Sequence, residues 1–164
     1  MIQSPLQKIM DWRQVLAWRN EMAETGNEVA VTNGCFDILH RGHAEYLYEA
    51  RRKADKLLVL VNSDSSLKEV KGPTRPIIEE ASRVYVLASL TAVDAVNIFS
   101  TLDCTEQLQQ LKPDVYVKGG DYTEKTLVRA EYKLLRSMGT RIELIPPVEG
   151  LSTSAIIDRI RNIS

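Results

Sequence analysis

Residues 28–43 read EVAVTNGCFDILHRGH and set the fold of this chain. The run begins with a short apolar stretch that closes on Gly34, which is typical of a buried β-strand. Residues 42–54 have apolar side chains at helical spacing, so a helix follows the strand after a short turn. A strand that passes through a glycine-containing turn into a helix predicts the first half of a β-α-β unit.

Strands and helices alternate along the rest of the chain. Residues 56–64, KLLVLVNSD, form a continuous apolar run, as in a parallel strand that is covered on both faces. We predict the remaining strands at 95–99, 114–118 and 141–145, and the helices at 79–90, 105–111, 124–138 and 152–161, with a loop at 65–78. This order predicts an α/β fold with a Rossmann-like, doubly wound, parallel five-stranded sheet and helices on both faces.

One further helix is predicted before the first strand. Apolar residues between Leu6 and Met22 recur at roughly helical spacing, and Gly26 is placed to end the helix, which therefore covers about residues 6–25. The length of 164 residues is that of one domain. We therefore expect a single domain over residues 1–164, with this N-terminal helix packed on it.

The composition narrows the class of protein. The net charge is −1, so no overall field favours nucleic acid or an acidic membrane, and neither is expected as a partner. Cys35 and Cys104 lie far apart and form no C-x-x-C pair, which favours reduced thiols over a zinc site or a disulfide. The N-terminal residues have no signal-peptide pattern and the longest apolar run is too short to cross a bilayer, so we expect a cytoplasmic protein.

The predicted strand-to-helix turn holds the only two histidines of the chain. Gly34 allows a ligand to approach the backbone closely, and Gly42 lies between His40 and His43 at the start of the helix. Unpaired N–H groups and the helix dipole attract anions there, and two imidazoles add hydrogen-bond donors. An anion site explains the glycines and the helix start together. A structural role for the histidines, or a metal site built from Asp37, His40 and His43, are the alternatives.

Other unusual clusters stand at the carboxyl ends of predicted strands, where open α/β sheets bind their ligands. These clusters are NSD at 62–64 with KGPTRP at 71–76, KGGDY at 118–122, and EGLSTS at 149–154. Lys71 and Arg75 are placed to reach a phosphate or to be solvated loop charges. Gly119 and Gly120 suit the close approach of a base or ribose, or a simple turn. Ser152 suits the N-cap of the last helix or a phosphate contact.

The apolar strand, the Gly-x-Phe-Asp run and the His-x-Gly-His run together resemble the signature of the HxGH nucleotidyltransferase superfamily, which contains cytidylyltransferases and adenylyltransferases. In that superfamily the two histidines hold the triphosphate and stabilise charge on the α-phosphate during in-line attack. The resemblance therefore implies these roles for His40 and His43, with pyrophosphate as the leaving group and Mg²⁺ bound with the triphosphate. Such chemistry depends on positioning and charge neutralisation more than on covalent catalysis.

The strings NGCFDILHRGH, VNSD, KGPTRP, PDVYVKGGDY and EGLSTSAII resemble the heptose 1-phosphate adenylyltransferase group over about Lys8 to Ile160. In many proteins that activity is the C-terminal half of a bifunctional chain with a sugar kinase, and this chain resembles the stand-alone form. The resemblance implies transfer of AMP from ATP to a heptose 1-phosphate, giving ADP-heptose for lipopolysaccharide or other surface glycans, by a homodimer. The alternatives are a CTP-dependent cytidylyltransferase acting on glycerol 3-phosphate or a similar alcohol phosphate, and a non-catalytic nucleotide-binding protein.

The same resemblance assigns the site residues. The residues implied to be catalytic are His40, His43 and Lys71. The residues implied to bind the nucleotide are Asn33, Gly34, Cys35, Phe36, Asp37, His40, Gly42, His43, Lys118, Gly119, Asp121, Glu149, Ser152, Thr153 and Ser154. The residues implied to bind the acceptor substrate are Asp64, Lys71, Arg75 and Arg83. Within these sets, residues 152–154 are implied to contact the β- and γ-phosphates, and Asp121 to lie near the sugar of the nucleotide.

Three positions depart from the common pattern of the group. Ser154 stands where a second threonine is common, and it keeps the hydroxyl. Ser82-Arg83 replaces a common Asp-Arg pair, so the partner of Arg83 is left open. Residues 101–105 alter the usual acidic Asp-Thr-Pro stretch, which we place outside the nucleotide site.

Overall fold

The computed structural model describes residues 3–120 and 129–163 of the chain. In this part of the chain, five strands form one sheet in the order β3-β2-β1-β4-β5, and neighbouring strands run parallel. The strands are β1 (Val29–Gly34), β2 (Lys56–Asn62), β3 (Ala95–Phe99), β4 (Val115–Gly119) and β5 (Arg141–Ile145). The predicted doubly wound parallel sheet is confirmed.

Apolar side chains on the two faces of the sheet build two cores. Val29, Val31 and Leu58 belong to the first core, whereas their neighbours Ala30 and Leu57 belong to the second. Successive side chains of a strand point to opposite faces, so β1 and β2 are buried on both sides. This burial explains the unbroken apolar run of β2.

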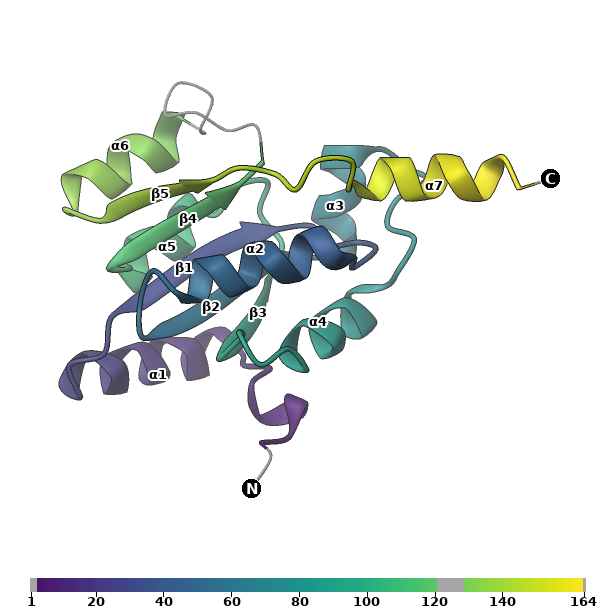
Figure 1. Cartoon of the computed structure of the whole chain (residues 1–164). Coiled ribbons are helices and arrows are strands. Elements are labelled where there is room, and N and C mark those ends of the chain that lie inside the picture. Colours follow the sequence, from purple (N-terminus) through teal and green to yellow (C-terminus); the bar gives the residue numbers. More distant parts are fainter. Residues whose placement is uncertain (1–2, 121–128, 164) are drawn as a thin grey trace.

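Helices cover both faces, as predicted. The helices whose apolar residues join the first core are α1 (Trp12–Glu24), α5 (Thr105–Leu111) and α6 (Arg129–Ser137). The helices that join the second core are α2 (Arg41–Arg51) and α4 (Glu80–Ala88). Figure 1 shows α2 crossing in front of β1 and β2. None of the helices in the described ranges combines the length and the apolar character that crossing a membrane requires.

The predicted helix over residues 6–25 is wrong at its N-terminal end. The segment begins with a 3₁₀ turn, η1 (Pro5–Gln7), and then runs beside β3, where Met10 N–H donates to the Val96 carbonyl at 2.9 Å. The α-helix starts only at Trp12, because Asp11 forms a capping box with Gln14. Of the apolar residues before Asp11, Ile9 and Met10 pack on the two cores, whereas Leu6 lies in the 3₁₀ turn and is exposed.

The predicted loop over residues 65–78 is wrong in its first half. A helix, α3 (Asp64–Lys71), follows β2 directly. Ser63 caps it, since its hydroxyl accepts the Ser66 N–H at 3.2 Å, and Gly72 ends it with a φ of +98°. The glycine and prolines of KGPTRP mark the end of this helix and the segment after it. The expected start of the 124–138 helix lies outside the described residues.

The carboxyl ends of β1 and β4 form the topological switch point of the sheet. The two strands are neighbours, but α2, which follows β1, joins the second core and α6, the next described helix after β4, joins the first. Ligands of doubly wound sheets bind in the crevice at such a point. The last helix, α7 (Thr153–Arg161), has no buried residue and projects from the molecule in Figure 1.

Candidate active site

His40 stands at the start of α2 and uses its own imidazole as the N-cap. Its backbone is extended, and its Nδ1 accepts the Gly42 N–H at 3.1 Å. Because Nδ1 is the acceptor, the neutral imidazole carries its proton on Nε2, which is then a donor. A Cβ at Gly42 would lie 3.0 Å from His40 Cε1 and 3.3 Å from Leu151 Cβ. Gly42 therefore admits the imidazole and brings the segment before α7 against the start of α2.

His43 lies directly against His40. The two rings are stacked with centroids 4.0 Å apart, and Phe36 meets the His43 ring edge-on at 5.4 Å. Burial, followed by the neighbouring His40, lowers the pKa of His43 to about 4, although the Ile38 backbone offsets part of the shift. Burial also lowers the pKa of His40. Both imidazoles are thus neutral donors near pH 7 in the free protein. The His43 Nδ1 atom is buried without a hydrogen-bond partner among the described residues.

Asp37 does not join the histidines. Its carboxylate is 2% exposed and accepts hydrogen bonds from the Ile77 N–H at 2.8 Å, the Ile78 N–H at 2.9 Å and Arg75 Nε. Asp37 therefore holds the segment after α3 against the β1–α2 turn. This arrangement speaks against the three-residue metal site, and no group of three or more His, Cys, Asp and Glu side chains in the described residues is placed to hold a metal.

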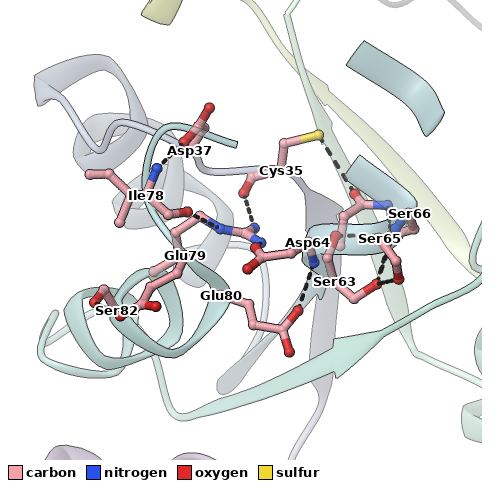
Figure 2. Close-up of polar contacts among 12 residues, drawn as sticks. Cys35, Asp37, Ser63, Asp64, Ser65, Ser66, Ile78, Glu79, Glu80 and Ser82 are labelled. Atoms are coloured by element: carbon pink, nitrogen blue, oxygen red, sulfur yellow. Dashed lines mark hydrogen bonds and ion pairs between the residues drawn. The ribbon is translucent and has the colours of Figure 1, made fainter. Parts of the chain in front are cut away.

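Arg83 is buried on α4 and joins three segments of the chain. Its guanidinium donates to the Cys35 carbonyl at 2.6 Å, the Ile78 carbonyl at 3.0 Å and Asp64 Oδ1 at 2.7 Å. Figure 2 shows Cys35, Ile78 and Asp64 turned toward these bonds from separate parts of the fold. Asp64 is thus the partner of Arg83 that the sequence left open. The fork geometry of a guanidinium suits such a junction.

Lys71 ends α3 and is exposed. Burial raises the pKa of Cys35, and the positive charge of Lys71 is the largest charge effect that opposes this shift. Lys71 therefore stands close enough to the β1–α2 turn to influence its electrostatics. Arg75 also opposes this shift and is bonded to Asp37, whereas the expected phosphate contact of either cation stays a prediction.

Asn33 and Lys118 face each other across the switch point. Lys118 Nζ donates to Asn33 Oδ1 at 2.7 Å, which joins the ends of β4 and β1. Gly119 follows Lys118 at the end of β4, and the ring of Tyr46 leaves no space there for a side chain. A Cβ at this position would lie 2.5 Å from Tyr46 Cε2. The hydroxyl of Tyr46 donates to the Val117 carbonyl at 3.1 Å, so the ring is fixed in that place.

Gly120 has a φ of +106°, which favours glycine, and its N–H donates to the Ile145 carbonyl at 3.1 Å, a bond that continues the pairing of β4 with β5. Asp121 lies outside the described residues.

At the last helix, Ser152 is an N-cap, since its hydroxyl accepts the Ala155 N–H at 3.1 Å. Glu149 and Ser154 are exposed and Thr153 is half-buried. Through Leu151 and Gly42, the starts of α7 and α2 lie side by side.

Two polar residues near the switch point did not emerge from the sequence. Tyr116 and Glu131 lie inside the fold and form hydrogen bonds that lead to Asn33. The available signals are weak. Tyr116 precedes Lys118 by two positions in an apolar strand, and Glu131 shares a helix face with the buried Leu135.

A family model described as cytidylyltransferase-like matches residues 31–159 of the chain. Among curated proteins, the chain is 48% identical over 135 residues to the bifunctional protein HldE of Syntrophotalea carbinolica, covering 82% of this chain and 27% of that protein. It is 42% identical over 157 residues to the bifunctional protein HldE of Helicobacter pylori strain J99, covering 96% of this chain and 31% of that protein. The chain thus spans about a third of these relatives.

Two solved structures are also similar. The lipopolysaccharide core biosynthesis protein from Thermoplasma volcanium has a TM-score of 0.61 and 28% identity, covering 75% of this chain and 98% of that one. The pantoate-β-alanine ligase from Francisella tularensis has a TM-score of 0.60 and 16% identity, covering 93% of this chain and 76% of that one. The second likeness is one of fold alone.

Proposed function

The chain belongs to the cytidylyltransferase-like family, and from that premise we propose that it transfers the adenylyl group of ATP to a heptose 1-phosphate, releasing pyrophosphate and forming ADP-heptose. The observation that carries the proposal is the pair of stacked, neutral imidazoles at the N-terminus of α2. A helix start with imidazole donors attracts the oxygens of a polyphosphate.

In the proposed reaction, a phosphate oxygen of the sugar 1-phosphate attacks the α-phosphorus of ATP in line. A new P–O bond forms, the bond to the bridging oxygen breaks, and its electron pair leaves with pyrophosphate. His40 contributes a donor at Nε2, and His43 lies against it on the same helix turn. Donors aimed at charge that develops in the transition state lower the barrier without a covalent intermediate.

Cationic side chains support the binding of an anionic substrate pair. Lys71 stands near the β1–α2 turn and Lys118 at the switch point, so we assign them to phosphate and nucleotide contacts respectively. The described residues offer nitrogen donors and no carboxylate cage, which suits a Mg²⁺ ion that arrives bound to triphosphate oxygens. When bound, the ion neutralises triphosphate charge.

Support for the heptose acceptor comes from the resemblance of the KGPTRP and KGGDY strings and from the similarity to the bifunctional HldE proteins. The structural likeness to a lipopolysaccharide core biosynthesis protein agrees with it. We also propose that the enzyme acts in the cytoplasm and that it forms a homodimer. A measurement of its mass in solution tests the homodimer.

Pyrophosphate release across a matrix of nucleoside triphosphates and sugar or alcohol phosphates, with Mg²⁺, tests this function. We expect release with ATP and a heptose 1-phosphate above all other pairs. Preference for CTP with glycerol 3-phosphate would overturn the substrates and keep the class of enzyme. Tight nucleotide binding without turnover on any acceptor would instead indicate a non-catalytic protein.

A further inference from the structure

A chain of buried polar groups runs from the β1–β4 crevice into α6. We propose that Tyr116 and Glu131 are positioning residues that hold Asn33 and Lys118 in the geometry that receives the nucleotide. The inference rests on the proposed function, because it assigns Lys118 to the nucleotide. It goes further in naming two residues, neither of which faces the ligand, as determinants of nucleotide affinity.

The first link lies at the end of β4. Tyr116 and Lys118 are two positions apart on one strand, so their side chains point to the same face of the sheet. Lys118 Nζ lies 2.7 Å from Asn33 Oδ1 and 3.4 Å from the Tyr116 hydroxyl, which itself lies 2.8 Å from Asn33 Oδ1. The three polar groups form a triangle that joins β4 to β1.

The second link lies behind this triangle. Glu131 of α6 is 1% exposed, and its Oε2 atom lies 3.1 Å from the Tyr116 hydroxyl. Its Oε1 atom lies 3.2 Å from both the N–H and the Sγ of Cys104. A carboxylate accepts hydrogen bonds only, and these three donors offset the cost of burying it. Glu131 is therefore held in place independently of Lys118.

Tyr116 stands at the centre of this hydrogen-bond network. Burial raises the pKa of Tyr116, with Cys104 and Glu131 adding to the shift, so the phenol keeps its proton. The phenol has one proton to donate, and its two acceptors are Asn33 Oδ1 at 2.8 Å and Glu131 Oε2 at 3.1 Å. Lys118 Nζ donates to the phenol oxygen at 3.4 Å and to Asn33 Oδ1 at 2.7 Å, so Tyr116 links Lys118 and Asn33 to Glu131.

This arrangement restrains a side chain that is otherwise mobile. A lysine has many rotamers, and holding its ammonium in one of them removes an ordering cost from ligand binding. Tyr116 and Lys118 are both near the switch point, where the nucleotide of a doubly wound fold binds. Packing alone requires no polar groups at Tyr116 and Glu131, since apolar side chains fill such space without a desolvation cost.

Two nearly isosteric variants test the proposal, Tyr116→Phe and Glu131→Gln. We expect each to raise the KM for ATP and the calorimetric Kd for Mg-ATP about tenfold, while the KM for the sugar phosphate stays within about twofold. Tyr116→Phe in a Lys118→Met background should add little, because Tyr116 acts through Lys118.

Thr140→Val is the matched control. Thr140 is 5% exposed and its hydroxyl donates to the Pro113 carbonyl at 2.8 Å, away from the carboxyl ends of the strands. This variant should lower thermal stability and leave the KM and Kd for ATP unchanged.

Unchanged ATP affinity in both folded test variants, or full additivity with Lys118→Met, would overturn the inference. Wild-type enzyme that binds Mg-ATP without turnover contradicts only the proposed function, and the Kd comparison still decides the inference. Wild-type enzyme that does not bind Mg-ATP contradicts both.

Discussion

The guanidinium of Arg83 donates a 2.6 Å hydrogen bond to the carbonyl oxygen of Cys35. The next residue, Phe36, is buried and has a φ of +46°, a backbone conformation that residues other than glycine rarely adopt. Asp37, on the other side of Phe36, is bonded to the segment after α3. The turn that leads to His40 is thus clamped on both sides of its strained residue.

We expect Arg83→Lys to destabilise the protein, because an ammonium cannot satisfy the carbonyls of Cys35 and Ile78 and the carboxylate of Asp64 together. Unpaired buried groups cost on the order of 3 kcal/mol in unfolding free energy here. Urea denaturation followed by circular dichroism measures it. Ser82→Ala, at an exposed neighbouring position, should change stability by less than about 0.5 kcal/mol. Equal stability of Arg83→Lys and wild type would contradict the clamp.

The fold followed from the sequence wherever local pattern decides structure. The strands predicted at 95–99 and 141–145 match β3 and β5 at both ends, because their β-branched and other apolar side chains, such as Val96 and Ile142, favour an extended backbone. The predicted helix bounds were wrong where an N-cap residue sets the start of a helix. Asp11 caps α1, so this helix begins only at Trp12, and Ser63 caps α3. Neither cap residue changes the spacing of the apolar residues around it. Propensity patterns do not register such single hydrogen bonds.

The site followed from the sequence only in its local part. His40 and His43 are three residues apart, so a helix start brings them together without any tertiary information. Arg83 and Cys35 are 48 residues apart, and their bond depends on how α4 packs on the sheet. Asp37 and Arg75 were both expected in the ligand site, but the structure pairs them with each other. Long-range pairing of charges leaves no periodic trace in a sequence.

Asp37→Asn should loosen the segment after α3. The variant replaces one carboxylate oxygen by an amide nitrogen, which is a donor and cannot accept from the Ile77 or Ile78 N–H group. Arg75 also loses its charged partner. We expect the hydrogen-exchange protection of these two amides to fall at least tenfold, equivalent to about 1.4 kcal/mol. The exposed Glu79→Gln change nearby should leave protection intact. Full protection in Asp37→Asn would show that other contacts hold the segment.

Gly119→Ala should be destabilising because of Tyr46 and not because of a ligand. The added Cβ would lie 2.5 Å from Tyr46 Cε2, and overpacking of this kind costs about 1–3 kcal/mol. A double-mutant cycle with Tyr46→Ala checks the cause, since Gly119→Ala should cost little once the ring is absent. An undiminished cost in the Tyr46→Ala background would exclude the ring as the reason.

The lowered pKa of His43 predicts that the stability of the free protein depends on pH. Its pKa is about 4 in the fold against 6.5 without the fold, so the unfolded chain binds more protons between these values. The contribution of His43 to the unfolding free energy is therefore complete above pH 6.5 and declines as the pH falls toward 4. Unfolding curves of wild type and His43→Gln should diverge in this window. NMR titration of His43 near 6.5 or above would contradict the prediction, and adding triphosphate should raise its pKa.

Two substitutions of His40 can separate its proposed role in the reaction from its role as the N-cap of α2. Its Nδ1 caps α2 by accepting the Gly42 N–H, while its Nε2–H is the group assigned to the triphosphate. Asparagine is a good N-cap and alanine is not, so His40→Ala should lose about 1 kcal/mol of stability and His40→Asn much less. Both remove the imidazole donor, so kcat for pyrophosphate release should fall by about 10²–10³ in each. If His40→Asn kept wild-type turnover, His40 would be a helix cap alone, because the variant preserves the cap and removes only the donor.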